Sequence, residues 1–344
     1  MVLPATWSAA LSLLILSTLC LGLWPNIFKI AGKYRFELFS LDFAVGAVTC
    51  ALVAAFSLGT LGSDLSFSDS MLVAGRRAEL MAVVTGGVFA FGNMLYLATI
   101  ALMGLTNGTL LTFSMLGVTL SVMEATHGHF MTAGISLLFL GAAAGVAVAA
   151  ARANRTAKPT LTRNPAQAKQ PQQFSSSFKG AITGMLAGLA FACVLPVLRL
   201  AEGEQLGIGA YGGLLLATFG ILISTFVFNF FFMNVSLEGG SISFSTYLSS
   251  SIKNHLTGAI CGVAWAIGAI SLYTACTGTA GVTRSHGWAV PFGAAALAVV
   301  SGMAFWQKAP QTAIVRRNKL ISMALFFIGA TVLLLNTRSV PLSQ

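Results

Sequence analysis

The chain has 344 residues, of which 56% are hydrophobic and only 8% are charged, and its formal net charge is +10. Soluble globular proteins carry about 25% charged residues, so this composition excludes a soluble domain and predicts an all-α integral membrane protein. The net positive charge is expected to mark cytoplasmic loops, which collect Lys and Arg in membrane proteins, and not a nucleic-acid-binding surface.

Ten apolar segments have the roughly 20 residues that a membrane-spanning helix needs. The first has no basic residue before its apolar run, so we expect a retained helix and not a signal peptide. The ten segments are expected at 7–28, 40–61, 80–103, 107–125, 130–151, 180–200, 208–233, 255–276, 284–306 and 318–336.

A basic linker divides the chain into two halves. Residues 152–178 are rich in Gln, Ser, Pro and cations, which predicts a flexible cytoplasmic segment between five-helix units at 1–151 and 179–344. With the N-terminus outside, the inner loops carry 14 Lys and Arg residues and the outer loops carry five. This bias predicts both termini outside.

The two halves share short matching patterns, which predict an internal repeat. Pro25 and Pro196 each lie near the end of an apolar helix, 171 residues apart, and both are candidate hinges because proline weakens helical bonding. GGVFAFGNMLY (86–96) matches CGVAWAIGAISLY (261–273) in its glycine spacing, with an offset of 176. Five helices per copy would insert the second copy upside down, as in transporters with inverted repeats.

Three stretches resemble a known family. The run GLWPNIFKIAGKYRFELFSLDF, with Gly22, Trp24, Pro25 and the Leu41-Asp42-Phe43 triplet, resembles the start of the plant-type ureide permeases. GGVFAFGNMLYLATIALMGLTNGT and GAICGVAWAIGAISLYTACTGTAGV resemble other helices of that family, and the second is shared with bacterial glucose/ribose and rhamnose porters. The resemblance to this drug/metabolite transporter superfamily implies ten helices in an inverted five-plus-five repeat and small-molecule transport, often proton-coupled.

Two acidic residues are candidate sites for a coupling ion, because an ionisable group inside a membrane is costly and is retained for function. Asp42 is the first candidate, and the alternative is a carboxylate that caps the start of a helix. Glu124 is the second, and the favoured alternative for it is a cap of the fourth helix near His127 and His129. No metal site is expected, because the His and Cys residues lack the spacing of metal ligands.

Aromatic and amide side chains are the candidates for solute contact, because aromatic faces suit planar rings and amides form paired hydrogen bonds. The alternative for each aromatic residue is packing or a place at the membrane interface. Arg284 and His286 open the ninth helix where the family has small and polar residues. The candidates are Trp24, Asn26, Asn93, Tyr96, Thr112, Trp265, Tyr273, Arg284, His286 and Trp288.

The sequence therefore predicts a secondary transporter of the cytoplasmic membrane. It would carry a small polar solute, ureide- or nucleobase-like, by alternating access driven by a proton or another ion, within the lipid bilayer. A sugar porter, and a channel or non-transporting scaffold, stay open as alternatives. The sequence lacks an ATP-binding Gly-x-x-x-x-Gly-Lys-Ser/Thr loop and the intramembrane acid and His clusters of membrane enzymes. We expect neither an enzyme nor a cofactor, and a homodimer is left open.

Overall fold

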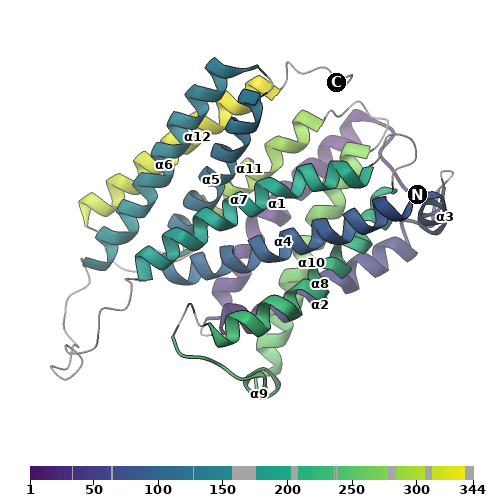
Figure 1. Cartoon of the computed structure of the whole chain (residues 1–344), viewed down its shortest axis with the longest axis horizontal. Helices are drawn as coiled ribbons and strands as arrows, with labels where there is room; N and C mark the ends of the chain where they lie inside the picture. Colours follow the sequence, from purple (N-terminus) through teal and green to yellow (C-terminus); the bar gives the residue numbers. More distant parts are fainter. Residues whose placement is uncertain are drawn as a thin grey trace.

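The computed structural model describes residues 1–32, 34–62, 65–126, 128–156, 176–202, 208–235, 237, 239–277, 282, 284–306 and 312–337. Side chains at 155–156, 195–202, 284–285 and 336–337 are not described. Every regular element in these ranges is a helix (Figure 1). The helices are α1 (Trp7–Ile30), α2 (Phe36–Phe56), α3 (Phe67–Val73), α4 (Arg76–Met103), α5 (Leu105–Thr126), α6 (Phe130–Thr156), α7 (Ser176–Glu202), α8 (Ala210–Asn234), α9 (Phe244–Leu248), α10 (Ile252–Thr277), α11 (Arg284–Trp306) and α12 (Ala313–Thr337).

The ten long helices are those that the apolar segments predicted, and each has the length and composition to cross a membrane. The second begins at Phe36 and ends at Phe56, so its predicted bounds of 40–61 were about four residues late. The short helices α3 and α9 were not predicted. Helices α6 and α7 also extend into both ends of the predicted linker, and residues 157–175 lie outside the described ranges.

Local sequence explains where several helices begin and end. Thr6 Oγ1 accepts a hydrogen bond from the Ala9 amide at the start of α1, and Ser66 Oγ accepts one from Asp69 at the start of α3. These hydroxyls satisfy amides that have no partner in the first helical turn. Gly104 has a φ of +84°, a conformation that favours glycine, and it separates α4 from α5.

The bundle has two ends, which we name after their short helices. Helix α3 lies beside the N-terminus at one end, called the α3 end (Figure 1). The connection between α1 and α2 lies at the other end with α9, and we call this the α9 end. Lys29 of α1, Arg35 in the connection to α2 and Lys253 of α10 lie at the α9 end. Arg76 and Arg77 lie at the start of α4, at the α3 end.

The helices of the two halves pack in matching pairs. Helix α4 packs against α7 and α8, and α10 packs against α1 and α2; helix α5 packs against α7 as α11 packs against α1. Exchanging the two halves converts each of these contacts into its counterpart. A short helix precedes both α4 and α10. This pattern agrees with the predicted repeat, and the inverted orientation of the second copy stays a prediction.

Glycines permit the closest of these contacts. A Cβ on Gly86 of α4 would overlap the Ala217 carbonyl of α8, and a Cβ on Gly262 of α10 would overlap the Phe43 carbonyl of α2. Gly86 and Gly262 are one of the pairs that the offset of 176 aligns. The aligned glycines therefore have the same packing role in the two halves.

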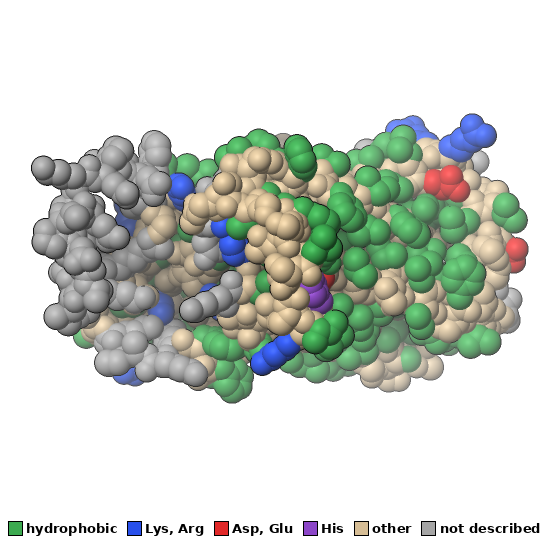
Figure 2. All heavy atoms as spheres, turned by 90° about the horizontal axis from the view of Figure 1, so that it is seen from below, with side chains coloured by type: hydrophobic (Ala, Val, Ile, Leu, Met, Phe, Trp, Pro, Cys, Tyr) green, Lys and Arg blue, Asp and Glu red, His purple; other side chains and the backbone are tan. Residues whose placement is uncertain are grey.

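Much of the outer surface is apolar, as a lipid-facing surface requires. Figure 2 shows hydrophobic side chains over much of one flank. Exposed Phe226, Phe230 and Phe231 on α8 and Leu138 on α6 are typical of this surface. Together with the ten apolar helices, this surface identifies a multi-pass membrane protein.

Candidate functional site

A cavity of about 560 Å³ lies between the two halves of the bundle. Its wall is formed by α1, α4 and α5 of the first half and by α7, α8, α10 and α11 of the second. The wall includes Ile208, Thr277 and Gly287, which lie at the α3 end. From α1 it includes only Leu21 and Trp24, which lie in the second half of that helix. The cavity therefore extends from the middle of the bundle toward the α3 end.

The wall of this cavity is largely apolar and aromatic, and none of the described residues that line it is charged. Ligand sites of roughly 300–1,000 Å³ are typically apolar, with a few polar groups that fix orientation. The cavity has the size and chemistry for one small uncharged solute. Five predicted solute-binding residues line it, namely Trp24, Tyr96, Trp265, Tyr273 and Trp288.

The remaining predicted solute-binding residues lie elsewhere. Thr112 is fully buried in α5, and its hydroxyl has no hydrogen-bond partner among the described residues. His286 is partly exposed and directly precedes Gly287 of the cavity wall. The side chain of Arg284 lies outside the described residues, so its predicted role is not tested.

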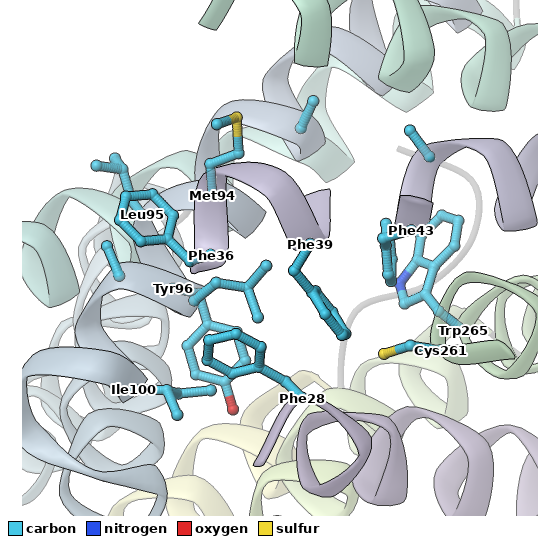
Figure 3. Close-up of a cluster of buried hydrophobic side chains, with 14 of the residues drawn as sticks. Phe28, Phe36, Phe39, Phe43, Met94, Leu95, Tyr96, Ile100, Cys261 and Trp265 are labelled. Carbon is cyan, nitrogen blue, oxygen red and sulfur yellow. The ribbon is translucent and has the colours of Figure 1, made fainter. Parts of the chain in front are cut away.

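Aromatic rings form the inner limit of the cavity, on its α9 side. The rings of Trp24 and Phe43 have centroids 5.5 Å apart, and those of Phe43 and Trp265 are 5.7 Å apart. Tyr96 packs edge-on against Trp24 at 5.8 Å. Figure 3 shows Phe43 and Trp265 together, with Cys261 beside them and Phe39 between this group and Tyr96. Phe39 and Phe43 are buried and do not line the cavity, so this layer lies between the cavity wall and the α9 end.

Asn93 lies next to this aromatic layer. It follows Phe89 by four residues and precedes Tyr96 by three, which places all three on one face of α4; Phe89 and Tyr96 both line the cavity. Asn93 is 2% exposed, and its Oδ1 has no hydrogen-bond partner among the described residues. A buried amide oxygen without a partner is costly. Asn93 thus offers an unused acceptor close to the cavity.

Asn26, by contrast, connects α1 to α11. Its Nδ2 donates to Ser301 Oγ at 2.9 Å, and its Oδ1 accepts from Trp306 Nε1 at 2.8 Å. It does not line the cavity. The observed bonds are those of a tether between the halves at the α9 end, and its predicted contact with solute has no support in this geometry.

Asp42 is the centre of a polar cluster at the α9 end. It is the seventh residue of α2, which begins at Phe36, so the interpretation of Asp42 as a helix cap is wrong. Its Oδ2 accepts from Tyr34 Oη at 2.7 Å, and its Oδ1 accepts from Tyr247 Oη at 2.7 Å. His255 Nδ1 lies 2.9 Å from Oδ1. The carboxylate therefore has three partners, drawn from both halves of the chain.

The two phenols of this cluster are held as donors. Burial, followed by the hydrogen bond to Asp42 and its charge, raises the pKa of Tyr34 and of Tyr247 above the ordinary tyrosine value. Both hydroxyls therefore keep their protons over the physiological pH range. While the Asp42 carboxylate is charged it can only accept hydrogen bonds, so both phenols act as donors to it.

Further contacts tie the halves together at the α9 end. Arg35 forms an ion pair with Glu37 and also donates to the Gly240 carbonyl at 2.6 Å. The Cys261 thiol lies 3.4 Å from the Trp24 carbonyl. With the Asn26 tether and the Asp42 cluster, these contacts hold the two halves together on the α9 side of the bundle. They and the aromatic rings lie between the cavity and the α9 end, and we call them together the closed layer.

The other predicted functional residues lie away from this cluster. Glu124 is in the last turn of α5, and its Oε2 is buried without a hydrogen-bond partner among the described residues. Helix α1 continues past Pro25 to Ile30, and Pro25 is buried. Pro196 lies within α7, but its side chain is not described. Among the described residues, no group of three or more His, Cys, Asp or Glu side chains could hold a metal ion.

Sequence reasoning missed three members of the Asp42 cluster, namely Tyr34, Tyr247 and His255. Tyr34 and Tyr247 lie outside the ten long helices, and His255 is in the first turn of α10. The signal was weak, because only the fold brings position 42 beside 247 and 255. One usable sign was a histidine at the start of an apolar helix, in a chain with four histidines.

Comparison with known proteins finds a similar curated protein. The chain is 28% identical to ureide permease 4 of Arabidopsis thaliana over 159 residues, which is 42% of the chain and 39% of that permease. The match thus spans well under half of either protein. No protein-family model matches the chain. The crystal structure of another protein aligns with 97% of this chain and 100% of its own at 15% sequence identity, with a TM-score of 0.49.

Proposed function

We propose that this protein is a secondary transporter that carries a small uncharged polar solute by alternating access. The observation that carries the proposal is the cavity, which is lined by helices of both halves and closed on its α9 side. Movement of one half against the other would close the α3 side and open the α9 side, as in transporters built from inverted repeats. The partial similarity to a ureide permease supports transport as the activity.

The chemistry of the cavity favours a planar, nitrogen-containing solute such as a ureide or nucleobase. The rings of Trp24, Phe89 and Trp265 offer flat apolar faces. The unused Oδ1 of Asn93 would accept a hydrogen bond from a solute N–H. The hydroxyl groups of a sugar could also donate to this oxygen, so sugars are a second class of solute to test.

Coupling to a proton is the second part of the proposal. Asp42 is the first candidate for the coupling residue, because it is buried and its carboxylate contacts both halves. Glu124 is the second candidate, with a partly buried carboxyl at the other end of the bundle. Proton binding at a group shared by both halves would link the protonation state to the conformation.

The charge distribution supports one orientation. Lys29, Arg35 and Lys253 lie at the α9 end, so the positive-inside rule assigns this end to the cytoplasm. Both termini would then lie outside the cytoplasmic membrane, and the cavity would face outward. Labelling of termini and loops in intact cells with an impermeant reagent tests this assignment.

Transport itself is tested with the purified full chain in proteoliposomes. The panel contains allantoin, uracil, xanthine, glucose, ribose and rhamnose, each tested with and without an inward proton gradient. Saturable, gradient-stimulated uptake of allantoin or a nucleobase is the expected result. Uptake of sugars alone would move the protein to the sugar-porter class. Non-saturable flux would indicate a channel, and no flux of any solute would contradict transport of these classes.

A further inference from the structure

The Asp42 cluster joins two helices that alternating access would have to separate. Asp42 lies on α2, whereas Tyr247 lies on α9 and His255 on α10. A Cβ on Gly258 of α10 would lie 2.5 Å from the Asp42 Cβ, so the two helices are in close contact at this level. Any motion that opens the α9 end between α2 and α10 must break the bonds from Tyr247 and His255 to the carboxylate.

The two ionisable members of the cluster differ in their access to water. The His255 side chain is 24% exposed, whereas that of Asp42 is 6% exposed. A proton arriving from the α9 side therefore reaches the imidazole ring before the carboxylate. Tyr34 and Tyr247 pack edge-on against the ring, with centroids 6.1 and 4.7 Å away. The ring is thereby held in position, with its Nδ1 toward Asp42.

The neighbouring charges are engaged elsewhere or exposed. Arg35 pairs with Glu37 and binds the Gly240 carbonyl. Lys29 of α1 reaches the Ile100 carbonyl at 3.4 Å. Lys253 of α10 is exposed, and the described part of α8, which packs against α2 and α10, has no charged side chain. With both phenols held protonated, Asp42 and His255 form the acid–base pair of this site.

We propose that Asp42 and His255 form a proton-binding latch that controls the α9 end of the cavity. A proton bound to the imidazole converts the contact into an imidazolium–carboxylate pair across the two halves, which holds this end closed. Loss of that proton leaves a hydrogen bond from a neutral imidazole to the carboxylate and removes the attraction between two opposite charges. That attraction is appreciable at this distance in a partly buried site, so the end opens more readily without it. The latch rests on the proposed function only in treating the α9 end as one that opens.

Two native cysteines report on the two sides of the closed layer. Along α10, Cys261 lies between His255 and Trp265 and is fully buried, so a reagent reaches it when the α9 end opens. Cys276 lines the cavity near the α3 end. Chains that keep one of these cysteines, with the other four replaced by Ser, give two matched reporters of opposite openings.

The experiment measures the rate of maleimide labelling of Cys261 in detergent-solubilised full chain across a pH series. His255→Gln keeps a hydrogen-bonding side chain but cannot take up the proton. The ratio of labelling rates between this variant and the parent, taken at each pH, cancels the pH dependence of the thiol. We expect His255→Gln to label faster than the parent at low pH, on the order of tenfold if the charge contributes about 1.4 kcal/mol, and the ratio to approach one at high pH. Cys276 labelling should change in the opposite direction.

Two further variants, Glu79→Gln and Tyr247→Phe, serve as controls for the labelling experiment. Glu79→Gln removes an ionisable group at the position of α4 that the offset of 176 matches to His255, and it should behave as the parent. Tyr247→Phe removes one bond of the cluster but keeps both titrating groups. It should label faster at every pH while keeping the pH dependence, and it carries the test if His255→Gln does not fold.

A ratio of labelling rates that stays constant over pH would overturn the latch. The latch would also be overturned if Cys261 of the parent labelled as fast as free cysteine in solution at every pH. No solute is used, so absence of transport in proteoliposomes would overturn the proposed function without affecting this result. Transport with a constant labelling ratio would overturn the latch alone.

Discussion

Phe89 and Trp265 pack against each other at the cavity, with ring centroids 4.5 Å apart and the ring planes tilted by 33°. The separation of 265 from 89 is 176, the same offset that aligns Gly86 with Gly262. In the predicted repeat, Phe89 and Trp265 are therefore equivalent residues, and equivalent residues can touch only close to the axis that relates the two copies. The proposed rocking motion would be centred on this contact, which lies in the wall of the cavity.

Substitution of this ring pair should affect solute binding. Trp265→Ala removes one of the two packed rings and is expected to lower solute affinity at least about tenfold, because base–aromatic stacking contributes about 1–3 kcal/mol per base. Trp265→Phe keeps a flat ring and should retain most of the affinity. The measurement is solute-induced thermal stabilisation over a concentration series. Equal affinity in the parent and Trp265→Ala would show that the solute does not bind here.

Asn93→Leu separates a functional role from a structural one. Replacing a buried polar group that lacks a partner with an apolar group should leave stability unchanged or raise it. The same change removes the acceptor proposed for the solute. We expect an unchanged or higher melting temperature, together with loss of solute-induced stabilisation. A large fall in melting temperature would mean that Asn93 has a structural partner.

Gly262→Ala tests the close contact between α2 and α10. The added methyl group would overlap the Phe43 carbonyl, and overpacking typically costs about 1–3 kcal/mol. Gly145→Ala on α6 is the matched control, because nothing lies within 4 Å of its Cβ and alanine favours a helix by about 1 kcal/mol. Thermal unfolding in detergent should show a loss for the first variant and none for the second. Equal melting temperatures would contradict the packing.

Asn26→Ala removes the tether between α1 and α11 and leaves Trp306 Nε1 without its acceptor. A buried donor without a partner costs about 1–3 kcal/mol, and Trp306 is partly buried, so the melting temperature should fall by less than a fully buried donor would cause, and Cys261 should label faster. Asn234→Ala is the control, because that amide donates within its own helix to the Phe230 carbonyl. Unchanged Cys261 labelling in Asn26→Ala would mean that the tether does not contribute to closure.

Asp42→Asn should abolish gradient-driven accumulation and leave equilibrium exchange, because the amide cannot bind and release a proton at this site. Glu124→Gln in the same assay tests the second candidate. Proteoliposomes with an imposed proton gradient give accumulation, and counterflow without a gradient gives exchange. Accumulation that survives in Asp42→Asn would remove Asp42 as the coupling group.

Most of the fold could be predicted from sequence, because membrane-spanning helices are recorded in long apolar runs that need no tertiary information. The start of α2 was placed too late because Phe36 and Glu37 follow a basic loop, and sequence alone does not show the Arg35–Glu37 ion pair that compensates the buried charge. The internal repeat could be predicted because the glycines that permit close helix contacts are spaced alike in the two halves.

The site could be predicted only in part. Five aromatic candidates line the cavity. They could be predicted because large aromatic rings commonly line ligand sites. Asn26 and Asp42 could be identified as unusual polar residues, but their partners could not. Ser301, Tyr247 and His255 are more than 200 residues away in the chain, and nothing local in the sequence pairs them.

The most direct test of the central claim is solute uptake by a chain whose cavity has been filled. Leu214 of α8 lines the cavity, whereas Ile223 of the same helix is 60% exposed on the outer surface. Initial rates of saturable uptake in proteoliposomes would be compared among the parent, Leu214→Trp and Ile223→Trp. Uptake should be lost in Leu214→Trp, whose added indole fills the cavity, and should stay at the parental rate in Ile223→Trp. Parental uptake in a correctly folded Leu214→Trp chain would contradict the central claim, because the solute would then cross by another route.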